Sequence, residues 1–447
     1  MCRNNYNLLV VSDLHLGQRK PGESAESIQK KREVISLHFG SFLQHYTKNR
    51  KDGDPWKLII NGDFIDFMRI HLPLIDVAEH LPEHTKKNAV RQLRVVCRTH
   101  KPIFVALTRF LKAGNSVVVV TGNHDAEWEW REVRTEFKKI LWNLSRSSEV
   151  HFLSHLEFVD RYYYEPGKVF IEHGHFYDPY CNCQMKINSK NESYVTSFSH
   201  EVTRYQYKQG KAFNSLPLHK FDQWGFLDII LWVLSRPLSE IKAIIVQYIK
   251  MATFLILISI RNFFTRSKPP KRERQPLTPR LDHVVRPPLH TSLFRTVQAF
   301  YLDRIFLLFT FAFSFTFVLV SSWTQGIRLW SSLGVLVGVV FLFLILTRIH
   351  PSTQSTPMLR KAVSLISKEV QSPVLVMAHS HEFDMIENQD VTYINVGHWT
   401  VPHKKHIPIL NPSKKEPSFS SPYLMIQLEK TLQSVEVHHW DYFGELW

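Results

Sequence analysis

Five short apolar runs in the chain each end in a group of polar residues. The runs are four or five residues long and rich in Val, Ile and Leu: 7–11, 56–60, 117–120, 168–171 and 374–377. Short aliphatic and β-branched runs that stop at Gly, Asn or Asp are typical of buried strands that finish in turns. Because loops held by rigid strands place functional groups, we expect the polar residues to gather at one edge of a sheet.

The polar groups after these runs combine carboxylates, an amide and imidazoles. In chain order they read Asp13-Leu14-His15, Gly62-Asp63-Phe64-Ile65-Asp66, Gly122-Asn123-His124-Asp125, His173-Gly174-His175 and His379-Ser380-His381. Such ligands suit Mn, Fe, Zn or Ni, and the lack of a thiolate argues against a structural zinc site. Two ions about 3.5–4 Å apart need a shared ligand, and a carboxylate can give one oxygen to each. Asp63 is the candidate for this bridge.

The order and content of these groups resemble the motifs of the calcineurin-like metallophosphoesterase superfamily: DxH, GDxxD, GNH(D/E), a His before Gly, and GHxH. The resemblance implies two divalent metal ions, with Mn favoured, and two ligand sets that share one carboxylate. The first set is Asp13, His15, Asp63 and His381. The second set is Asp63, Asn123, His173 and His379. One residue departs from the motifs, because Ala378 stands where GHxH has Gly; a turn tolerates this if φ is negative.

The same resemblance implies the catalytic residues. His124 matches the residue that contacts the phosphate and helps the leaving group, and Asp125 the residue that orients it. Two cations would lower the pKa of a bridging water from ~15.7 towards ~7, and His124 would stabilise or protonate the departing oxygen. The alternative role of Asp125 is a turn cap. Asp66 is expected outside the metal shell, as a supporting or turn residue.

The stretch after His173 leaves several roles open. His175 and Asp178 either line the site or face solvent. Cys181 and Cys183 form no second pair, so we interpret them as ordinary loop cysteines.

Composition indicates a folded intracellular protein with a basic surface. The chain has 447 residues, 44% of them hydrophobic, and four cysteines without an even framework. Since the first strand starts within about six residues, we expect no signal peptide and a reducing, cytoplasmic setting. The net charge of +15 favours a nucleic acid or an anionic lipid as partner. The basic stretch 266–274 lies between hydrophobic segments and no nucleic-acid module accompanies it, so we expect lipid; a solvated linker is the alternative.

Residues 184–372 separate the fourth and fifth motifs and differ in composition. Two uncharged runs, 305–323 and 329–347, are each ~19 residues long, which as helices would span roughly 28 Å of a bilayer. They predict a transmembrane hairpin, with a hairpin buried in a soluble core as the alternative. The apolar segment 226–260 is interrupted by charges and predicts amphipathic helices in the membrane interface. A second hairpin or soluble packing is the alternative there, and 261–290 reads as a basic linker.

Topology limits the number of spans. Motifs on both sides of the insertion must meet on one side of a membrane to build one site, so the number of spans between them must be even. A single third span in 226–260 is therefore excluded if the site assembles.

The sequence thus predicts an α/β protein with a four-layer metallophosphoesterase β-sandwich flanked by helices. Its two parts, 1–183 and 373–447, are interrupted by the transmembrane hairpin insertion 184–372. The predicted function is hydrolysis of a phosphate ester or pyrophosphate bond by a membrane-anchored enzyme whose catalytic domain faces the cytoplasm. The alternatives are a membrane-tethered phosphodiesterase or protein phosphatase, and a non-catalytic metal-binding scaffold.

The anchor suggests a substrate class. Because it brings the site to the bilayer surface, we expect a lipid-linked or membrane-proximal phosphate ester. The chain resembles the UDP-diacylglucosamine pyrophosphatases in the His-Gly pair after its fourth strand. It differs in carrying His124, where those enzymes have Arg, and in its long hydrophobic insertion.

Overall fold

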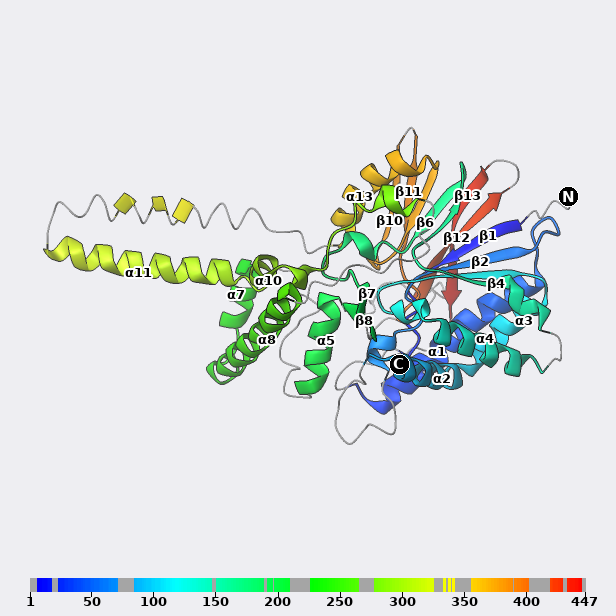
Figure 1. Cartoon of the computed structure of the whole chain (residues 1–447), viewed down its shortest axis with the longest axis horizontal. Helices are drawn as coiled ribbons and strands as arrows, with labels where there is room; N and C mark the ends of the chain where they lie inside the picture. Colours follow the sequence, from blue (N-terminus) through cyan, green and yellow to red (C-terminus); the bar gives the residue numbers. More distant parts are fainter. Residues whose placement is uncertain are drawn as a thin grey trace, which may run out of the picture. The chain divides into compact units, whose positions relative to one another are not determined.

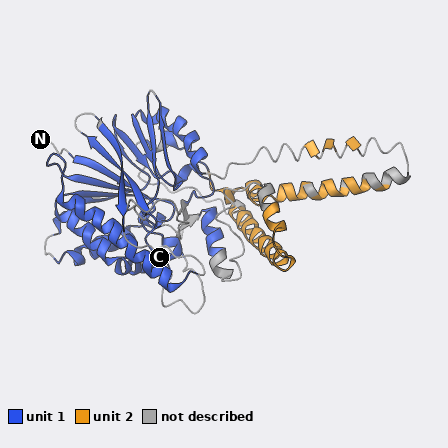
Figure 2. Ribbon diagram, turned by 180° about the vertical axis from the view of Figure 1, so that it is seen from behind, with its two compact units in different colours: residues 1–211, 269–286, 355–447 blue, residues 212–268, 287–354 orange. Residues whose placement is uncertain are grey.

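The computed structural model divides the chain into two compact units (Figure 2). We call residues 1–211, 269–286 and 355–447 the sheet unit, and residues 212–268 and 287–354 the helical unit. Parts of the predicted insertion 184–372 therefore belong to the sheet unit. The structure describes residues 6–17, 23–70, 84–146, 150–188, 191–195, 197–209, 226–264, 277–324, 333–334, 337–338, 340–341, 355–388, 390–401, 419–428 and 432–443.

Two mixed sheets form the centre of the sheet unit (Figure 1). The first has the order β13-β12-β1-β2-β3-β4, with β1 (Tyr6–Val11), β2 (Trp56–Asn61), β3 (Ser116–Val120), β4 (Leu156–Val159), β12 (Phe419–Leu428) and β13 (Leu432–Tyr442). The second has the order β10-β11-β9-β6-β5, with β5 (Tyr162–Glu165), β6 (Val169–Glu172), β9 (Val374–Met377), β10 (Phe383–Glu387) and β11 (Thr392–Val396). A hairpin, β7 (Gln184–Asn188) and β8 (Asn191–Val195), stands apart from them.

All five strands predicted from the apolar runs are confirmed, as β1, β2, β3, β6 and β9. They do not belong to one sheet, however, because β6 and β9 lie in the second. These two strands are parallel neighbours, with Val169 opposite Val374. The pairing joins the chain before the helical unit to the chain after it.

The alternation of side chains along the strands explains why the sheets stack. Leu8, Val10 and Ile59 point to the second sheet and share a buried core with residues such as Ile171 and Val376. Their neighbours point to a helical layer made of α1 (Ala25–Lys48), α2 (Lys86–Thr99), α3 (Lys101–Lys112) and α4 (Arg131–Ser145). On the far side of the second sheet lie α9 (Thr278–Leu281) and α13 (Ser355–Val370). The four predicted layers are present.

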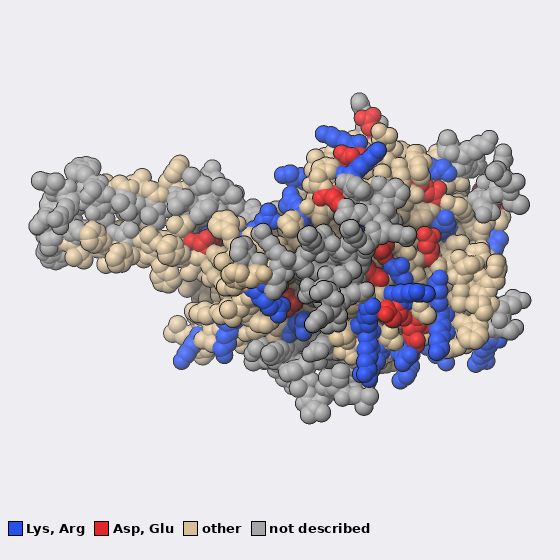
Figure 3. All heavy atoms as spheres, in the orientation of Figure 1, with Lys and Arg blue, Asp and Glu red and all other residues tan. Residues whose placement is uncertain are grey.

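Short helices complete the sheet unit. The 3-10 turns are η1 (Phe67–Arg69), η2 (Ala126–Glu129), η3 (His151–His155) and η4 (His175–Tyr177), and α5 (Phe198–Gln209) follows the β7–β8 hairpin. Lys and Arg side chains gather over the helical layer α2–α4 (Figure 3). The basic stretch 266–274, for which we expect lipid contact, lies outside the described residues.

The helical unit contains α7 (Phe226–Leu234), α8 (Leu238–Phe264), η6 (Leu289–Thr291), α10 (Leu293–Ala299) and α11 (Leu302–Thr324). One face of α8 is buried through Ile244, Met251 and Leu255, and Ser259 Oγ lies 2.8 Å from Thr296 Oγ1 of α10. Within the described residues, Leu238–Asn262 is long and apolar enough to cross a membrane, and α10 with the start of α11, bent by 73°, passes the same test as a pair.

These helices bear on the predicted insertion without deciding its topology. The run 305–323 lies within α11, whereas most of 329–347 lies outside the described residues. The transmembrane hairpin stays a prediction. The segment 226–260, which was expected in the membrane interface, includes most of Leu238–Asn262, the described stretch that meets the length and composition of a membrane span.

Candidate metal centre

The loops at the carboxyl ends of β1, β2, β3, β6 and β9 bring the seven predicted ligands together. Because β1, β2 and β3 are parallel in one sheet and β6 and β9 are parallel in the other, these ends meet at one side of the sandwich. The loop after β9 is tied to the loop after β1, where the backbone N–H of His379 donates to Asp13 Oδ2 at 3.3 Å. The backbone N–H of His124, after β3, donates to Asp63 Oδ1 at 2.8 Å.

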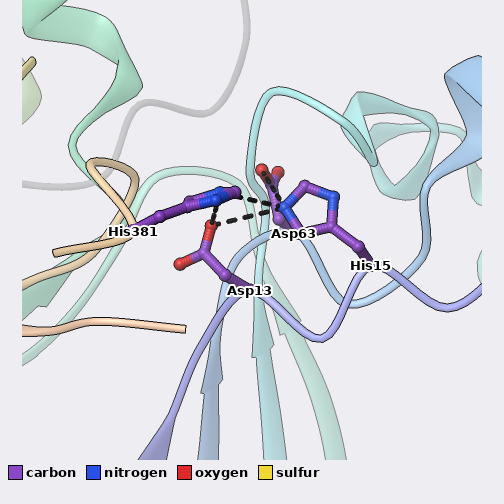
Figure 4. Close-up of side chains that lie close together, drawn as sticks. All are labelled: Asp13, His15, Asp63 and His381. Atoms are coloured by element: carbon purple, nitrogen blue, oxygen red, sulfur yellow. Dashed lines mark hydrogen bonds and ion pairs between the residues drawn. The ribbon is translucent and has the colours of Figure 1, made fainter. Parts of the chain in front are cut away.

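The first group of candidate ligands is Asp13, His15, Asp63 and His381, and their ligand atoms lie within 4.8 Å of one another (Figure 4). His381 Nε2 is 3.1 Å from both Asp13 Oδ1 and His15 Nε2. His15 Nε2 is 3.5 Å from Asp63 Oδ2. Three of the four side chains are buried, whereas that of His381 is 41% exposed, so the group is open to solvent on the His381 side.

The second group consists of Asp63, Asn123, His173 and His379. His173 Nε2 lies 3.2 Å from Asn123 Oδ1 and 3.5 Å from Asp63 Oδ2. The rings of His173 and His379 are 5.3 Å apart. Asp63 is thus common to both groups, and the same oxygen faces one imidazole of each.

The donors fit divalent cations. Ligands about 2.1 Å from a metal at tetrahedral or octahedral angles are roughly 3.0–3.4 Å apart, which is close to the observed spacing. Among the described residues, no donor meets the buried Asp13 Oδ1 in hydrogen-bond geometry, and this oxygen lies 3.1 Å from His381 Nε2. Asp13, Asp63, Asp66 and Asp125 are all buried. Buried carboxylates at this density require positive charge, because removing an ion from water is costly unless it is compensated.

The backbone at the ligands is strained. Asp13, His15, Asp63, His379 and His381 all have φ between 47° and 72°, the left-handed region that few non-glycine residues adopt. Such conformations cost about 1–3 kcal/mol each and concentrate at functional sites. Ala378 is not among the positive-φ residues, so the missing Gly of the last motif requires no strain.

Two glycines are required by close approach. A Cβ on Gly62 would lie 2.3 Å from His173 Nδ1, and one on Gly122 would lie 2.2 Å from Asp63 Oδ1. Both contacts are far shorter than van der Waals distance. The glycines of the second and third motifs therefore make room for ligands from neighbouring loops.

Replacing Gly122 with Ala is expected to destabilise the protein by about 1–3 kcal/mol, because the new methyl group must displace Asp63. Cation binding at the two ligand groups should weaken with it. Denaturant unfolding of the variant measures the first effect. The control is Gly40→Ala in α1, where a Cβ meets nothing within 4 Å; it should stabilise the helix by about 0.5–1 kcal/mol. A Gly122→Ala protein that is as stable as the wild type and binds cations as well would contradict the packing argument.

His124 is oriented by Asp66, which corrects the role expected for Asp125. His124 Nδ1 lies 3.0 Å from Asp66 Oδ1. The Asp125 carboxylate instead accepts hydrogen bonds from the backbone N–H groups of Gly122 at 2.7 Å and Phe64 at 2.8 Å, and from Trp128 Nε1 at 3.0 Å. Asp125 thus ties the loops after β2 and β3 together, whereas the described carboxylate that contacts the His124 ring is that of Asp66. Its turn-capping alternative describes it better.

Charge keeps Asp66 ionised. Burial opposes its ionisation, but His124 and Arg69 outweigh burial and hold the pKa of Asp66 well below its ordinary value. Its second oxygen, Oδ2, lies 3.4 Å from His15 Nδ1. Asp66 therefore contacts both the candidate ligand His15 and the candidate acid His124. It belongs to neither ligand group, as the sequence predicts.

Two of the candidate ligands, His15 and His173, hold protons when no cation is bound. Burial lowers the pKa of His15, but the nearby carboxylates of Asp13 and Asp66 outweigh it and raise this pKa to about 10. Asp63 and Asp13 raise the pKa of His173 to about 9 against the same burial. Burial and the charge of Asp63 raise the pKa of Asp125 to about 7. Since a metal-ligating His must be deprotonated, cation binding at the two groups is expected to release protons.

The loop after β6 contributes more than the sequence indicated. His175 and Asp178 are both buried, and Asp178 Oδ2 lies 3.1 Å from His379 Nε2. Asp178, Cys181 and His379 form a further cluster with ligand atoms within 4.8 Å. Solvent exposure of His175 and Asp178, one of the two alternatives, is wrong. No spacing in the sequence relates Asp178 to a residue 201 positions away, so only the fold could reveal this contact.

Comparison with known proteins agrees with the geometry. Residues 6–228 match the family model described as calcineurin-like phosphoesterase. No curated protein matches the chain. The matched region holds the loops after β1, β2, β3 and β6, and the structure adds His379 and His381 from the loop after β9. The chain belongs to the calcineurin-like metallophosphoesterase superfamily.

Proposed function

We propose that this protein is a phosphoesterase that uses two divalent cations, with Mn²⁺ favoured, held by the seven clustered side chains. The observation that carries the proposal is the position of Asp63, whose Oδ2 lies 3.5 Å from His15 Nε2 and 3.5 Å from His173 Nε2. A carboxylate placed between two ligand groups can serve both. When bound, the two cations supply Lewis acidity toward a phosphoryl group and make water a nucleophile near neutral pH.

The remaining residues then have defined tasks. The Asp66 carboxylate accepts a hydrogen bond from Nδ1 of His124, which leaves Nε2 of His124 for the substrate. A proton on Nε2 can pass to the oxygen of the leaving group as the P–O bond breaks. Asp125 holds the backbone that carries His124, and so acts on position rather than on protons.

The test is hydrolysis of bis-p-nitrophenyl phosphate and p-nitrophenyl phosphate by detergent-purified protein, with Mn²⁺ and other divalent metals. Activity that depends on added metal supports the enzyme, and the diester-to-monoester ratio directs the substrate search. Folded protein that is inactive with every metal would favour the scaffold.

We propose further that the helical unit attaches the protein to a membrane. In α11 the side chains of Phe306, Phe309, Phe313 and Phe317 are more than half exposed and recur every three or four residues, as on one helical face. The described atoms of α11 carry little charge (Figure 3). In α8, Ile249, Leu257 and Phe264 are also exposed. Exposed apolar side chains at this density mark a membrane or protein contact.

The even-number rule limits the topology. Because β6 and β9 pair directly, the chain must return to the side of the membrane from which it left. The rule is satisfied by α8 together with the bent α10–α11 pair, or by the hairpin 305–323 and 329–347 with α8 in the interface. Labelling of single cysteines placed before α8 and after α8 distinguishes the two, since only the first arrangement puts them on opposite sides.

Exchange of Phe309 and Phe313 for Lys is expected to release the protein from membranes. A Lys near the centre of a membrane helix costs about 2.5–3.5 kcal/mol, so two should abolish stable insertion. Flotation with lipid vesicles after an alkaline wash measures this, and the double Leu exchange at the same positions is the control. If the Lys variant floats like the wild type, α11 is not the anchor.

For the substrate we propose a phosphate ester or pyrophosphate linked to a lipid or lying close to the membrane, with the site on the cytoplasmic side. A membrane anchor raises the local concentration of such substrates at the metal centre. In detergent micelles a lipid-linked ester should be hydrolysed with a lower KM than its water-soluble headgroup analogue. Equal KM values would mean that the helical unit localises the protein to membranes but does not contribute to substrate recognition.

A further inference from the structure

Asp178 forms a hydrogen-bonded link with the candidate ligand His379. Its Oδ2 lies 3.1 Å from His379 Nε2, and both side chains are buried. Other donors fix the carboxylate, because the backbone N–H of Tyr180 donates to Oδ1 at 2.9 Å and Ser355 Oγ donates to Oδ2 at 3.1 Å. Asp178 is thus held by its own loop and by the first residue of α13. A carboxylate with so many partners can hold an imidazole in a fixed orientation.

The chemistry of this pair decides which nitrogen of His379 can bind a cation. A carboxylate oxygen facing an imidazole nitrogen accepts a hydrogen bond from it, so the 3.1 Å contact pairs Asp178 Oδ2 with an N–H at Nε2 of His379. A neutral imidazole then has its free lone pair on Nδ1. The Asp178 contact therefore leaves Nδ1 as the nitrogen of His379 that can bind a cation, in a ring whose centroid lies 5.3 Å from that of His173.

In the buried candidate ligands His15 and His173, one ring nitrogen faces the ligand group and the other faces a protein acceptor. The roles of Nδ1 and Nε2 are reversed relative to His379. His15 and His173 direct Nε2 toward Asp63, and their Nδ1 atoms face Asp66 Oδ2 at 3.4 Å and the carbonyl oxygen of Asn61 at 2.8 Å, respectively. Each imidazole thus has one nitrogen at a protein acceptor. Such outer partners orient metal-ligating histidines and increase their basicity.

A second interpretation is a separate cation held by Asp178, Cys181 and His379, whose ligand atoms lie within 4.8 Å. The hydrogen bonds argue against it. Both oxygens of Asp178 already accept from Ser355 or Tyr180, and the His379 nitrogen that faces Asp178 carries a proton in the pairing described above. A cation bound to that nitrogen would have to displace the proton and break the hydrogen bond to Asp178.

We infer that Asp178 is a positioning residue that fixes the tautomer and orientation of His379 for the second cation. The inference rests on the two-cation site proposed above. Nothing in the motifs includes Asp178, which lies five residues after His173 and comes to His379 only through the pairing of β6 with β9.

The test is a titration of the metal-free full-length protein with Mn²⁺. Calorimetry measures the affinity of each equivalent, and electron paramagnetic resonance detects coupling between two bound Mn²⁺ ions. In Asp178→Asn, the second equivalent should bind about 10–100-fold more weakly while the first is unchanged. Asn keeps the shape of the side chain but loses its charge and can present an amide N–H₂ to His379. The matched control is Asp384→Asn, which removes a buried carboxylate of β10 that pairs with Arg360 of α13; this variant should bind both equivalents normally.

A second variant guards against misfolding. Ser355→Ala removes one donor to the same oxygen and should weaken the second equivalent in the same direction but less. Unchanged affinity for the second Mn²⁺ in folded Asp178→Asn would overturn the inference. So would a thiolate-to-cobalt absorption band in Co²⁺-loaded wild type that is lost in Cys181→Ser and kept in Cys183→Ser, because that result assigns the cluster its own cation. If the wild type binds fewer than two ions, the proposed two-cation function itself fails.

Discussion

Replacement of Asp63 by Asn is expected to abolish metal-dependent phosphoesterase activity, with a loss greater than about 1000-fold. Asp63 Oδ2 lies between the two candidate ligand groups, at 3.5 Å from His15 Nε2 and from His173 Nε2. Loss of a residue that only hydrogen-bonds to a metal ligand typically costs 10–100-fold in metal affinity or activity. Loss of a bridging ligand should therefore exceed that range. The measurement is Mn²⁺-dependent release of p-nitrophenol together with the number of Mn²⁺ ions bound.

Asp63→Asn also needs a control for folding. The Asp63 side chain also accepts the backbone N–H of His124 at 2.8 Å, so a change there can disturb the loop after β3. The Asn side chain keeps an oxygen for that bond. Thermal unfolding of the metal-free variant should therefore remain near that of the wild type. An Asp63→Asn protein that keeps substantial activity with two bound ions would refute the bridging role.

Replacement of His124 by Ala is expected to lower kcat by about 10²–10⁴-fold while both Mn²⁺ ions still bind. The side chain of His124 is partly exposed beside the buried His15, with ring centroids 4.6 Å apart, and it is held by Asp66 rather than belonging to either ligand group. It can therefore meet a substrate without being needed for the cations. Kinetics at saturating Mn²⁺ and a metal titration separate the two effects.

The leaving group distinguishes acid catalysis from simple binding. A good leaving group such as p-nitrophenolate needs little protonation, whereas an alkoxide needs much more. The loss in His124→Ala should therefore be larger for an alkyl phosphate ester than for the nitrophenyl ester. Equal losses for both substrates would limit His124 to contact with the phosphate. An Asp66→Asn variant should show the same trend to a smaller extent, because it acts through the orientation of His124.

The sequence by itself determined the strands and the chemistry of the centre. Local patterns were enough for this, since an aliphatic run followed by Gly, Asn or Asp specifies a buried strand that ends in a turn. The runs at 56–60 and 117–120 were therefore assigned within one residue of β2 and β3. The residue types of the five motifs, in a known order, were enough to indicate the superfamily that the family model then showed.

Only the tertiary structure decided which residues support that centre. Asp66 and Asp125 are both acidic and both lie next to motif residues, and the sequence assigned the orientation of His124 to the wrong one. The Asp125 oxygens are used by Gly122, Phe64 and Trp128, whereas Asp66 reaches His124 across two loops. Hydrogen bonds between loops depend on how the strands pair, and strand pairing is not a local property of the sequence.

The same reason applies to Asp178 and to the division of the chain into units. Asp178 meets His379 because β6 and β9 are parallel neighbours, although the two residues are far apart in sequence and a whole helical unit lies between them. Hydrophobic composition distinguished the helical unit from the rest of the chain, because composition can be read from the sequence without knowledge of tertiary contacts. Which of its apolar faces are buried against α10 and which remain exposed depends on side-chain packing, and only the folded chain specifies that.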